Sequence, residues 1–185
     1  MMKLLLASQS PRRKELLSGL GFDFEVVKID CEEVLPEKIE IEKAAGYLSL
    51  LKADAFGVPE DGEVLLTADT IVAIDDRILG KPNNEADAKT MLRTLAGRTH
   101  QVYTAITIKT YDKIFTETDM AEVEFDEISD AEIQYYIHKY RPFDKAGSYG
   151  IQEWLGMAKI KKMNGSFYTI MGLPTHVVYK ILKEI

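Results

Sequence analysis

The chain has 185 residues, of which 46% are hydrophobic and 29% charged, a composition typical of one globular domain with its own core. Its net charge of −7 argues against a nucleic-acid-binding surface, because such a surface needs a basic field. The single cysteine, Cys31, excludes a disulfide framework, and no apolar run approaches the roughly 20 residues of a membrane span. Since the apolar stretch near the N-terminus is also too short for a signal sequence, we expect a cytoplasmic protein without a membrane span.

Strands and helices alternate along the first half of the chain. The apolar residues Leu4–Ala7 predict a buried strand that turns directly into a helix, with Ser10 as N-cap and Pro11 in the first helical position. The further elements predicted in this half are a strand at Phe22–Ile29, a helix over residues 39–56, a strand at Val64–Ile74 and a tight turn at Asp75-Asp76.

The second half continues the alternation. Asn84 is predicted to cap a helix, and Ser129 opens another through a capping box. The remaining predicted elements are strands at Val102–Ile108, at Ile114–Phe125 and near Met157–Ile160, and a C-terminal helix after Pro174. This order of elements predicts an α/β fold with a mixed sheet.

The turn between the first strand and the first helix has the composition of an anion receptor. Arg12 and Arg13 fall in the first helical turn, where a cation costs about 0.3–1 kcal/mol because the helix dipole favours an anion. With the hydroxyls of Ser8 and Ser10 and the free N–H groups of the helix start, they make a suitable receptor for phosphate. The alternative is a solvated arginine pair on an ordinary capped helix.

Asp69 and Thr70 interrupt an apolar strand. A carboxylate buried in a strand costs several kcal/mol unless it is paired, hydrogen-bonded or bound to a metal. This cost favours a functional role for Asp69, and the alternative is a structural aspartate bonded to backbone amides.

Two lysines and an acidic pair could extend such a site. Lys52 projects near the middle of the apolar face of the helix over residues 39–56, where it either snorkels to the rim or faces a cleft as a point charge for phosphate. Lys81, between a glycine and a proline, could serve similarly or be an ordinary turn lysine. Glu32 and Glu33 are either solvated or oxygen ligands for Mg²⁺ or Mn²⁺.

His100 is not expected to bind a metal. No second histidine or cysteine stands at metal-site spacing from it, so we expect a loop residue or a neighbour of the site.

The set and order of these motifs resemble the Maf family of nucleoside triphosphate pyrophosphatases from about Leu4 to Pro174. The motifs that carry the resemblance are Ser8-Gln9-Ser10-Pro11-Arg12-Arg13, Lys52-Ala53, Ala68-Asp69-Thr70, Gly80-Lys81-Pro82, Gly97-Arg98-Thr99-His100, Asp144-Lys145-Ala146-Gly147, Tyr149-Gly150-Ile151-Gln152 and Gly172-Leu173-Pro174. The resemblance implies one domain over residues 1–185 with a two-lobed α/β fold like that of the ITPases. That fold has an elongated mixed sheet flanked by helices and a central cleft, and its members are usually dimers.

The resemblance also implies roles for individual residues. Arg12 and Arg13, with Ser8 and Ser10 beside them, match the family's phosphate-binding arginines, and Lys52 and Lys81 match its phosphate-binding lysines. Asp69 matches the carboxylate taken as catalytic base or metal-linked group, and Glu33 matches the family's glutamate better than Glu32 does. We therefore expect a catalytic set of Asp69, Lys52 and Lys81, substrate contacts from Thr70 and Gln152, and a divalent cation, Mg²⁺ or Mn²⁺, held by Glu33 and Asp69.

The implied reaction is hydrolysis of a nucleoside triphosphate to the monophosphate and pyrophosphate. Gln152 lies in a segment typical of the branch that resembles dTTP/UTP pyrophosphatases, whereas the branch acting on 7-methyl-GTP differs there. Two departures from the family pattern, Glu153-Trp154-Leu155-Gly156 and Thr169, lie beside the expected base pocket. The alternatives are a 7-methyl-GTP-like preference, a catalytically weak nucleotide-binding regulator of cell division, and a phosphate-binding structural module.

Overall fold

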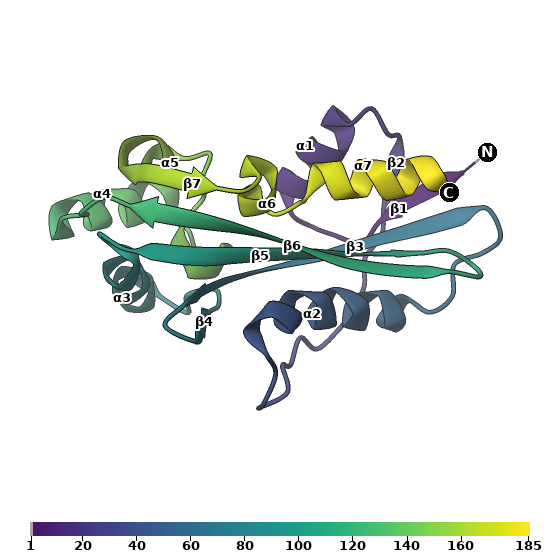
Figure 1. Ribbon diagram of the computed structural model, residues 1–185, viewed down its shortest axis with the longest axis horizontal. Coiled ribbons are helices and arrows are strands. Elements are labelled where there is room, and N and C mark those ends of the chain that lie inside the picture. Colours follow the sequence, from purple (N-terminus) through teal and green to yellow (C-terminus); the bar gives the residue numbers. More distant parts are fainter. Residues whose placement is uncertain (1) are drawn as a thin grey trace. The chain divides into compact units, whose positions relative to one another are not determined.

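The computed structural model describes residues 2–185, in which seven strands form one mixed sheet (Figure 1). The strand order is β2-β1-β3-β5-β6-β7, and β4 pairs with β3. The α/β fold with a mixed sheet flanked by helices is thereby confirmed. The strands are β1 (Lys3–Leu6), β2 (Phe24–Val26), β3 (Glu63–Ile74), β4 (Arg77–Leu79), β5 (Thr99–Lys109), β6 (Ile114–Phe125) and β7 (Ile160–Asn164).

The helices flank these strands in two compact units. They are α1 (Pro11–Gly19), α2 (Ile41–Phe56), α3 (Glu85–Leu95), α4 (Asp130–Tyr140), the 3-10 turn η1 (Ala146–Ser148), α5 (Trp154–Lys159), α6 (Phe167–Met171) and α7 (Thr175–Glu184). The first unit comprises the chain up to Thr70, Thr104–Asp119 and Gly172–Ile185, and the second comprises Ile71–Tyr103 and Met120–Met171. No helix among residues 2–185 has the length and apolar character that a membrane crossing requires.

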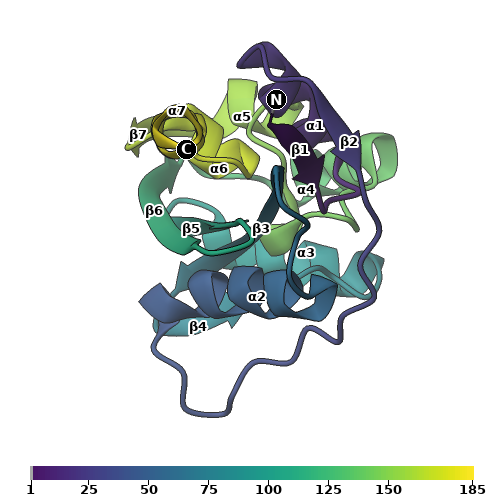
Figure 2. The same ribbon diagram turned by 90° about the vertical axis from the view of Figure 1, so that its right-hand side faces the viewer.

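In the first unit the strands are covered on both faces. Helices α1 and α7 lie on one face and α2 on the other (Figure 2). Strand β1 pairs in parallel with both β2 and β3, in a register that sets Leu5 beside Leu65. Leu5 and Leu65 pack with Ala53 of α2 in a fully buried cluster, and this apolar contact seats α2 on the sheet.

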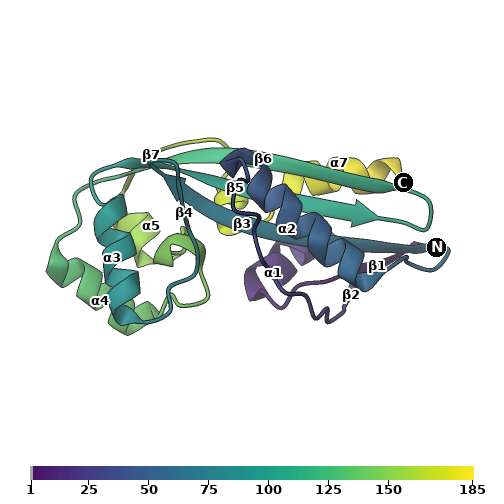
Figure 3. The same ribbon diagram turned by 90° about the horizontal axis from the view of Figure 1, so that it is seen from below.

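In the second unit α3, α4 and α5 gather on one side of the strands (Figure 3). Helix α4 begins with the predicted capping box, in which Ser129 and Glu132 bond each other's backbone, and Asn84 caps α3 as predicted. The turn at Asp75-Asp76 is also confirmed, and both residues have positive φ angles (50° and 55°), as a tight hairpin requires.

Three details of the predicted elements are wrong. The strand expected near Met157–Ile160 is helix α5 up to Lys159, and the strand begins only at Ile160. In a strand, Leu155 and Met157 would point to the same face of the sheet. Leu155 is buried whereas Met157 is 77% exposed, so this apolar run does not follow the strand pattern. Strand β2 is shorter than expected, and α6 was not predicted.

Candidate active site

The site lies where β1 ends. Strand β1 stops at Leu6, which pairs with Val26 on one side and Leu66 on the other, whereas β3 runs on to Asp69 and beyond. Helix α1, which follows β1, lies on one face of the sheet, and α2, which follows β2, lies on the other (Figure 2). In open α/β sheets such a switch point, at the carboxyl ends of parallel strands, is the usual place for a ligand.

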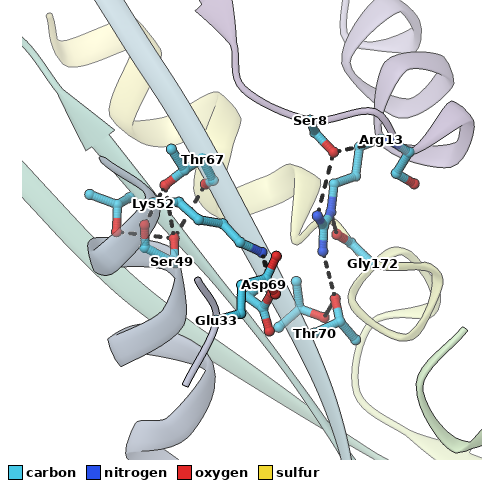
Figure 4. Close-up of polar contacts among 12 residues, drawn as sticks. Ser8, Arg13, Glu33, Ser49, Lys52, Thr67, Asp69, Thr70 and Gly172 are labelled. Carbon is cyan, nitrogen blue, oxygen red and sulfur yellow. Dashed lines mark hydrogen bonds and ion pairs between the residues drawn. The ribbon is translucent and has the colours of Figure 1, made fainter. Parts of the chain in front are cut away.

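Arg13 is held at this switch point by three elements (Figure 4). Its Nε donates to the Gly172 carbonyl at 2.8 Å, Nη2 donates to Thr70 Oγ1 at 3.2 Å and Nη1 to Ser8 Oγ at 3.5 Å. Burial lowers the pKa of Arg13, an effect that the charge of Asp69 opposes. The guanidinium is therefore fixed in place by the protein, and the N–H groups that these bonds leave over can serve an anion.

The helix start is arranged by Ser8 rather than by the expected cap. Ser10 occupies the N-cap position with Pro11 after it, as predicted, but its side chain makes no cap hydrogen bond. Instead the Ser10 N–H donates to Ser8 Oγ at 3.2 Å. Arg12 follows in the first turn of α1 and is half-buried.

Lys52 joins two carboxylates. Its Nζ lies 2.5 Å from Asp69 Oδ1 and 3.1 Å from Glu33 Oε2 (Figure 4). The side chains of Lys52 and Asp69 are only 14% and 11% exposed, whereas that of Glu33 is 41% exposed. Lys52 therefore does not snorkel to bulk water, and Asp69 has a charged partner rather than only backbone amides. A buried pair of this kind is costly to break, because removal of one member leaves the other charge unpaired.

Lys81 and Gln152 belong to the second unit, whereas the residues above belong to the first. Lys81 is exposed and follows Gly80, whose carbonyl accepts the Gly147 N–H at 3.1 Å. Gln152 is exposed after the buried Ile151. Their roles in binding phosphate and base stay predictions.

A buried polar cluster in the second unit was not predicted. Lys145 is 8% exposed, and its Nζ lies 3.1 Å from Glu153 Oε1. The second carboxylate oxygen of Glu153 accepts the Tyr136 hydroxyl, which in turn accepts the Gly150 N–H at 3.0 Å. Burial and Glu153 together raise the pKa of Tyr136. Both oxygens of Glu153 thus have partners within their own unit. Glu153, which departs from the family pattern, therefore stabilises the loop before Gln152 through Tyr136 and Gly150.

His100 lies in strand β5, not in a loop, and is fully buried. Its Nε2 lies 2.7 Å from the Tyr149 hydroxyl, and Nδ1 has no hydrogen-bond partner among residues 2–185. The ring packs against Phe125 and Tyr149. Burial lowers its pKa to about 4, so the imidazole is neutral at pH 7.

Comparison with known proteins agrees with this fold. The model of the family described as Maf-like protein matches residues 3–185, and the chain belongs to that family. A dTTP/UTP pyrophosphatase of Porphyromonas gingivalis (strain W83) is 50% identical over 186 residues, which cover 98% of this chain and 94% of that protein. A dTTP/UTP pyrophosphatase of Bacteroides thetaiotaomicron is 46% identical over 185 residues, covering 99% and 96%.

A solved structure of a HAM1 protein from Coxiella burnetii has the same fold. It superposes with a TM-score of 0.55 over 100% of both chains at 12% sequence identity. The resemblance to the Maf family inferred from the motifs is thus confirmed over nearly the whole chain.

Proposed function

We propose that this protein is a nucleoside triphosphate pyrophosphatase that hydrolyses dTTP and UTP to the monophosphate and pyrophosphate. The observation that carries the proposal is the buried pair of Lys52 and Asp69, whose Nζ and Oδ1 lie 2.5 Å apart. The pair lies at the switch point of the sheet, beside the Ser8–Arg13 turn. The relatives named dTTP/UTP pyrophosphatase, at 46% and 50% identity over nearly the full chain, support the same reaction and the same bases.

The first unit supplies the groups that bind the triphosphate. The guanidinium of Arg13, already fixed by three hydrogen bonds, neutralises phosphate charge without losing further side-chain freedom. Arg12 and the N–H groups at the start of α1 add donors on the same turn. Lys52 contributes a point charge to this phosphate clamp. The resemblance to the family implies a phosphate-binding role for Lys81 as well.

Asp69 acts on the attacking water. Its carboxylate orients a water molecule toward the α-phosphorus and accepts a proton from it as the new P–O bond forms. The bond from the α-phosphorus to the bridging oxygen breaks, and pyrophosphate leaves with that electron pair, its charge balanced by the clamp. Lys52 holds Asp69 in place for this step through their ion pair.

Glu33 and Asp69 fit a divalent cation. Both carboxylates contact the ammonium of Lys52 and so lie near one another, and carboxylate oxygens are the ligands that Mg²⁺ and Mn²⁺ prefer. Within residues 2–185 no three His, Cys, Asp or Glu side chains gather closely enough to hold a metal by themselves. This sparse set fits Mg²⁺, which usually takes one or two protein carboxylates together with substrate phosphates. Such an ion, held by Glu33 and Asp69, would neutralise charge on the phosphates.

We extend the proposal to a homodimer, as the resemblance to the family implies, and to a cytoplasmic location, which the single cysteine favours. Sedimentation equilibrium tests the dimer, and a mass of 20.9 kDa at all concentrations would contradict it.

The test is pyrophosphate release from a panel of nucleoside triphosphates with Mg²⁺. The wild type should prefer dTTP and UTP, and Asp69→Asn should lose at least about 100-fold in kcat. Asp54→Asn is the matched control, because Asp54 pairs with Lys109 in the same unit at 3.1 Å but is 57% exposed. A strong preference for 7-methyl-GTP would overturn the choice of bases, and nucleotide binding without pyrophosphate release would favour the regulator.

A further inference from the structure

Buried hydroxyl groups form a polar seam between α2 and the sheet. Ser49 Oγ lies 3.2 Å from Thr67 Oγ1 and donates to Thr107 Oγ1 at 3.0 Å, while Thr67 Oγ1 donates to the Ser49 carbonyl at 2.7 Å. All three side chains are fully buried. We call Ser49, Thr67 and Thr107 the hydroxyl cluster, and Figure 4 shows Ser49 and Thr67 beside Lys52.

The hydroxyl cluster and the Lys52–Asp69 pair join the same two elements. On β3, Thr67 and Asp69 are two residues apart and face the same side. On α2, Ser49 and Lys52 are three residues apart and share a face. Because helical side chains incline toward the N-terminus of their helix, the Lys52 side chain runs back past Ser49 to reach Asp69. Ser49 and Thr67 of the cluster therefore lie beside the Lys52 side chain (Figure 4).

Helix α2 also packs unusually closely against the sheet at Gly46. A Cβ on Gly46, one turn before Ser49, would lie 3.2 Å from Thr118 Oγ1 and 3.7 Å from Thr116 Cγ2 of β6. Thr107 Oγ1 lies 2.9 Å from Thr116 Oγ1, so the hydroxyl contacts continue from β5 to β6. Apolar packing alone is non-directional and lets a helix slide, whereas these hydrogen bonds fix distance and direction.

We propose that the hydroxyl cluster is a positioning device that fixes the register of α2 on β3 and thereby holds the Lys52 ammonium on Asp69. The expected effect on kcat rests on the proposed function, whereas the expected effect on the distance between Lys52 and Asp69 does not. Ser49, Thr67 and Thr107 act only through Lys52 and Asp69 and touch no substrate.

The test compares two substitutions of Thr67 with opposite effects. Thr67→Val keeps the shape and removes the hydroxyl, whereas Thr67→Ser keeps the hydroxyl and removes a methyl group from the core. Thr67→Val should lose about 10- to 100-fold in kcat, the range expected for a shift of up to about 1 Å in a reacting group. Thr67→Ser should keep kcat within about threefold although its melting temperature falls, because a lost methyl group leaves a cavity.

If the cluster had a purely structural role, kcat would fall in proportion to the melting temperature in both variants, and Thr67→Ser would lose kcat as well. That result would overturn the proposal. If Thr67→Val fails to fold, Ser49→Ala removes the partner hydroxyl and should lose kcat in the same range. Thr94→Val is the control, because the Thr94 hydroxyl bonds only its own helix, at the Thr90 carbonyl in the second unit.

Crystal structures of both Thr67 variants separate this proposal from the proposed function. The 2.5 Å separation of Lys52 Nζ and Asp69 Oδ1 should persist in Thr67→Ser and lengthen in Thr67→Val, whatever reaction the protein catalyses. An unchanged separation in Thr67→Val contradicts the positioning role, whereas a wild type without pyrophosphate release contradicts only the proposed function.

Discussion

Stability of the second unit should fall as the pH drops below about 6.5, because of His100. Burial lowers the pKa of this histidine from 6.5 to about 4 in the folded protein. Between these values the unfolded chain binds a proton that the folded protein excludes, so acid favours unfolding. Each pKa unit corresponds to about 1.4 kcal/mol, and the full loss by pH 4 is therefore about 3 kcal/mol. Above pH 6.5 this contribution is complete and constant.

Urea unfolding at a series of pH values from 4.5 to 8 measures this effect. The single tryptophan, Trp154, reports on the second unit by fluorescence. His100→Phe loses the contact with the Tyr149 hydroxyl, and this loss shifts the unfolding free energy by the same amount at every pH below 8. The variant should also flatten the slope of unfolding free energy against pH in the acid range. His138→Gln, an exposed histidine on α4, should leave the slope unchanged. Equal slopes for the wild type and His100→Phe would refute the reasoning.

Three further substitutions test other contacts. Arg13→Lys keeps the charge but loses the planar fork, and should lower the unfolding free energy by about 1–3 kcal/mol in urea unfolding and weaken nucleotide binding in calorimetry. Glu33→Gln should raise the Mn²⁺ concentration that half-saturates the nucleotide complex by at least about 10-fold, as measured by electron paramagnetic resonance of Mn²⁺. Gly156→Ala should destabilise by about 3 kcal/mol or more, because its Cβ would lie 1.7 Å from the Ile151 carbonyl oxygen.

Each of these has a control in the same chain. Arg93→Lys alters an exposed arginine–aspartate pair and should cost less than about 1 kcal/mol. Glu32→Gln changes the neighbouring carboxylate and should leave the Mn²⁺ requirement unchanged. Gly19→Ala, with no atom within 4 Å of the added Cβ, should stabilise α1 by up to about 1 kcal/mol. A control that changes as much as its test variant contradicts the local explanation.

Features that depend on neighbouring residues could be predicted from the sequence. Around the Ser8–Arg13 turn, the preceding strand, the serines and the proline influence only residues close to them in the sequence. Helix α1 begins where they predict. The same holds for the capping box at Ser129 and the turn at Asp75-Asp76, because local hydrogen bonds and allowed φ angles determine both.

The partners of the unusual residues could not be predicted locally. Lys52 and Asp69 each stood out as a charge in an apolar pattern, but their pairing depends on how α2 is seated on β3. Ser49 and Thr67 gave no signal, because a single hydroxyl in an apolar segment costs little when a partner is present.

The residues whose structure differs from the prediction depend on distant contacts or on an ambiguous pattern. The burial of His100 in a strand, where a loop residue or a neighbour of the site was expected, depends on the rings of Phe125 and Tyr149, which lie far along the chain. The short apolar run at Trp154–Ile160 fits a strand or a helix equally well by periodicity. The close approach of Gly156 to the Ile151 backbone is a contact that periodicity does not show.

Hydrolysis of dTTP in water enriched in ¹⁸O tests the proposed reaction most directly. If Asp69 directs water to the α-phosphorus, the label should appear in the nucleoside monophosphate and be absent from pyrophosphate. Label in pyrophosphate would mean attack at the β-phosphorus and would contradict this mechanism. Absence of turnover with dTTP and UTP would contradict the proposed activity itself.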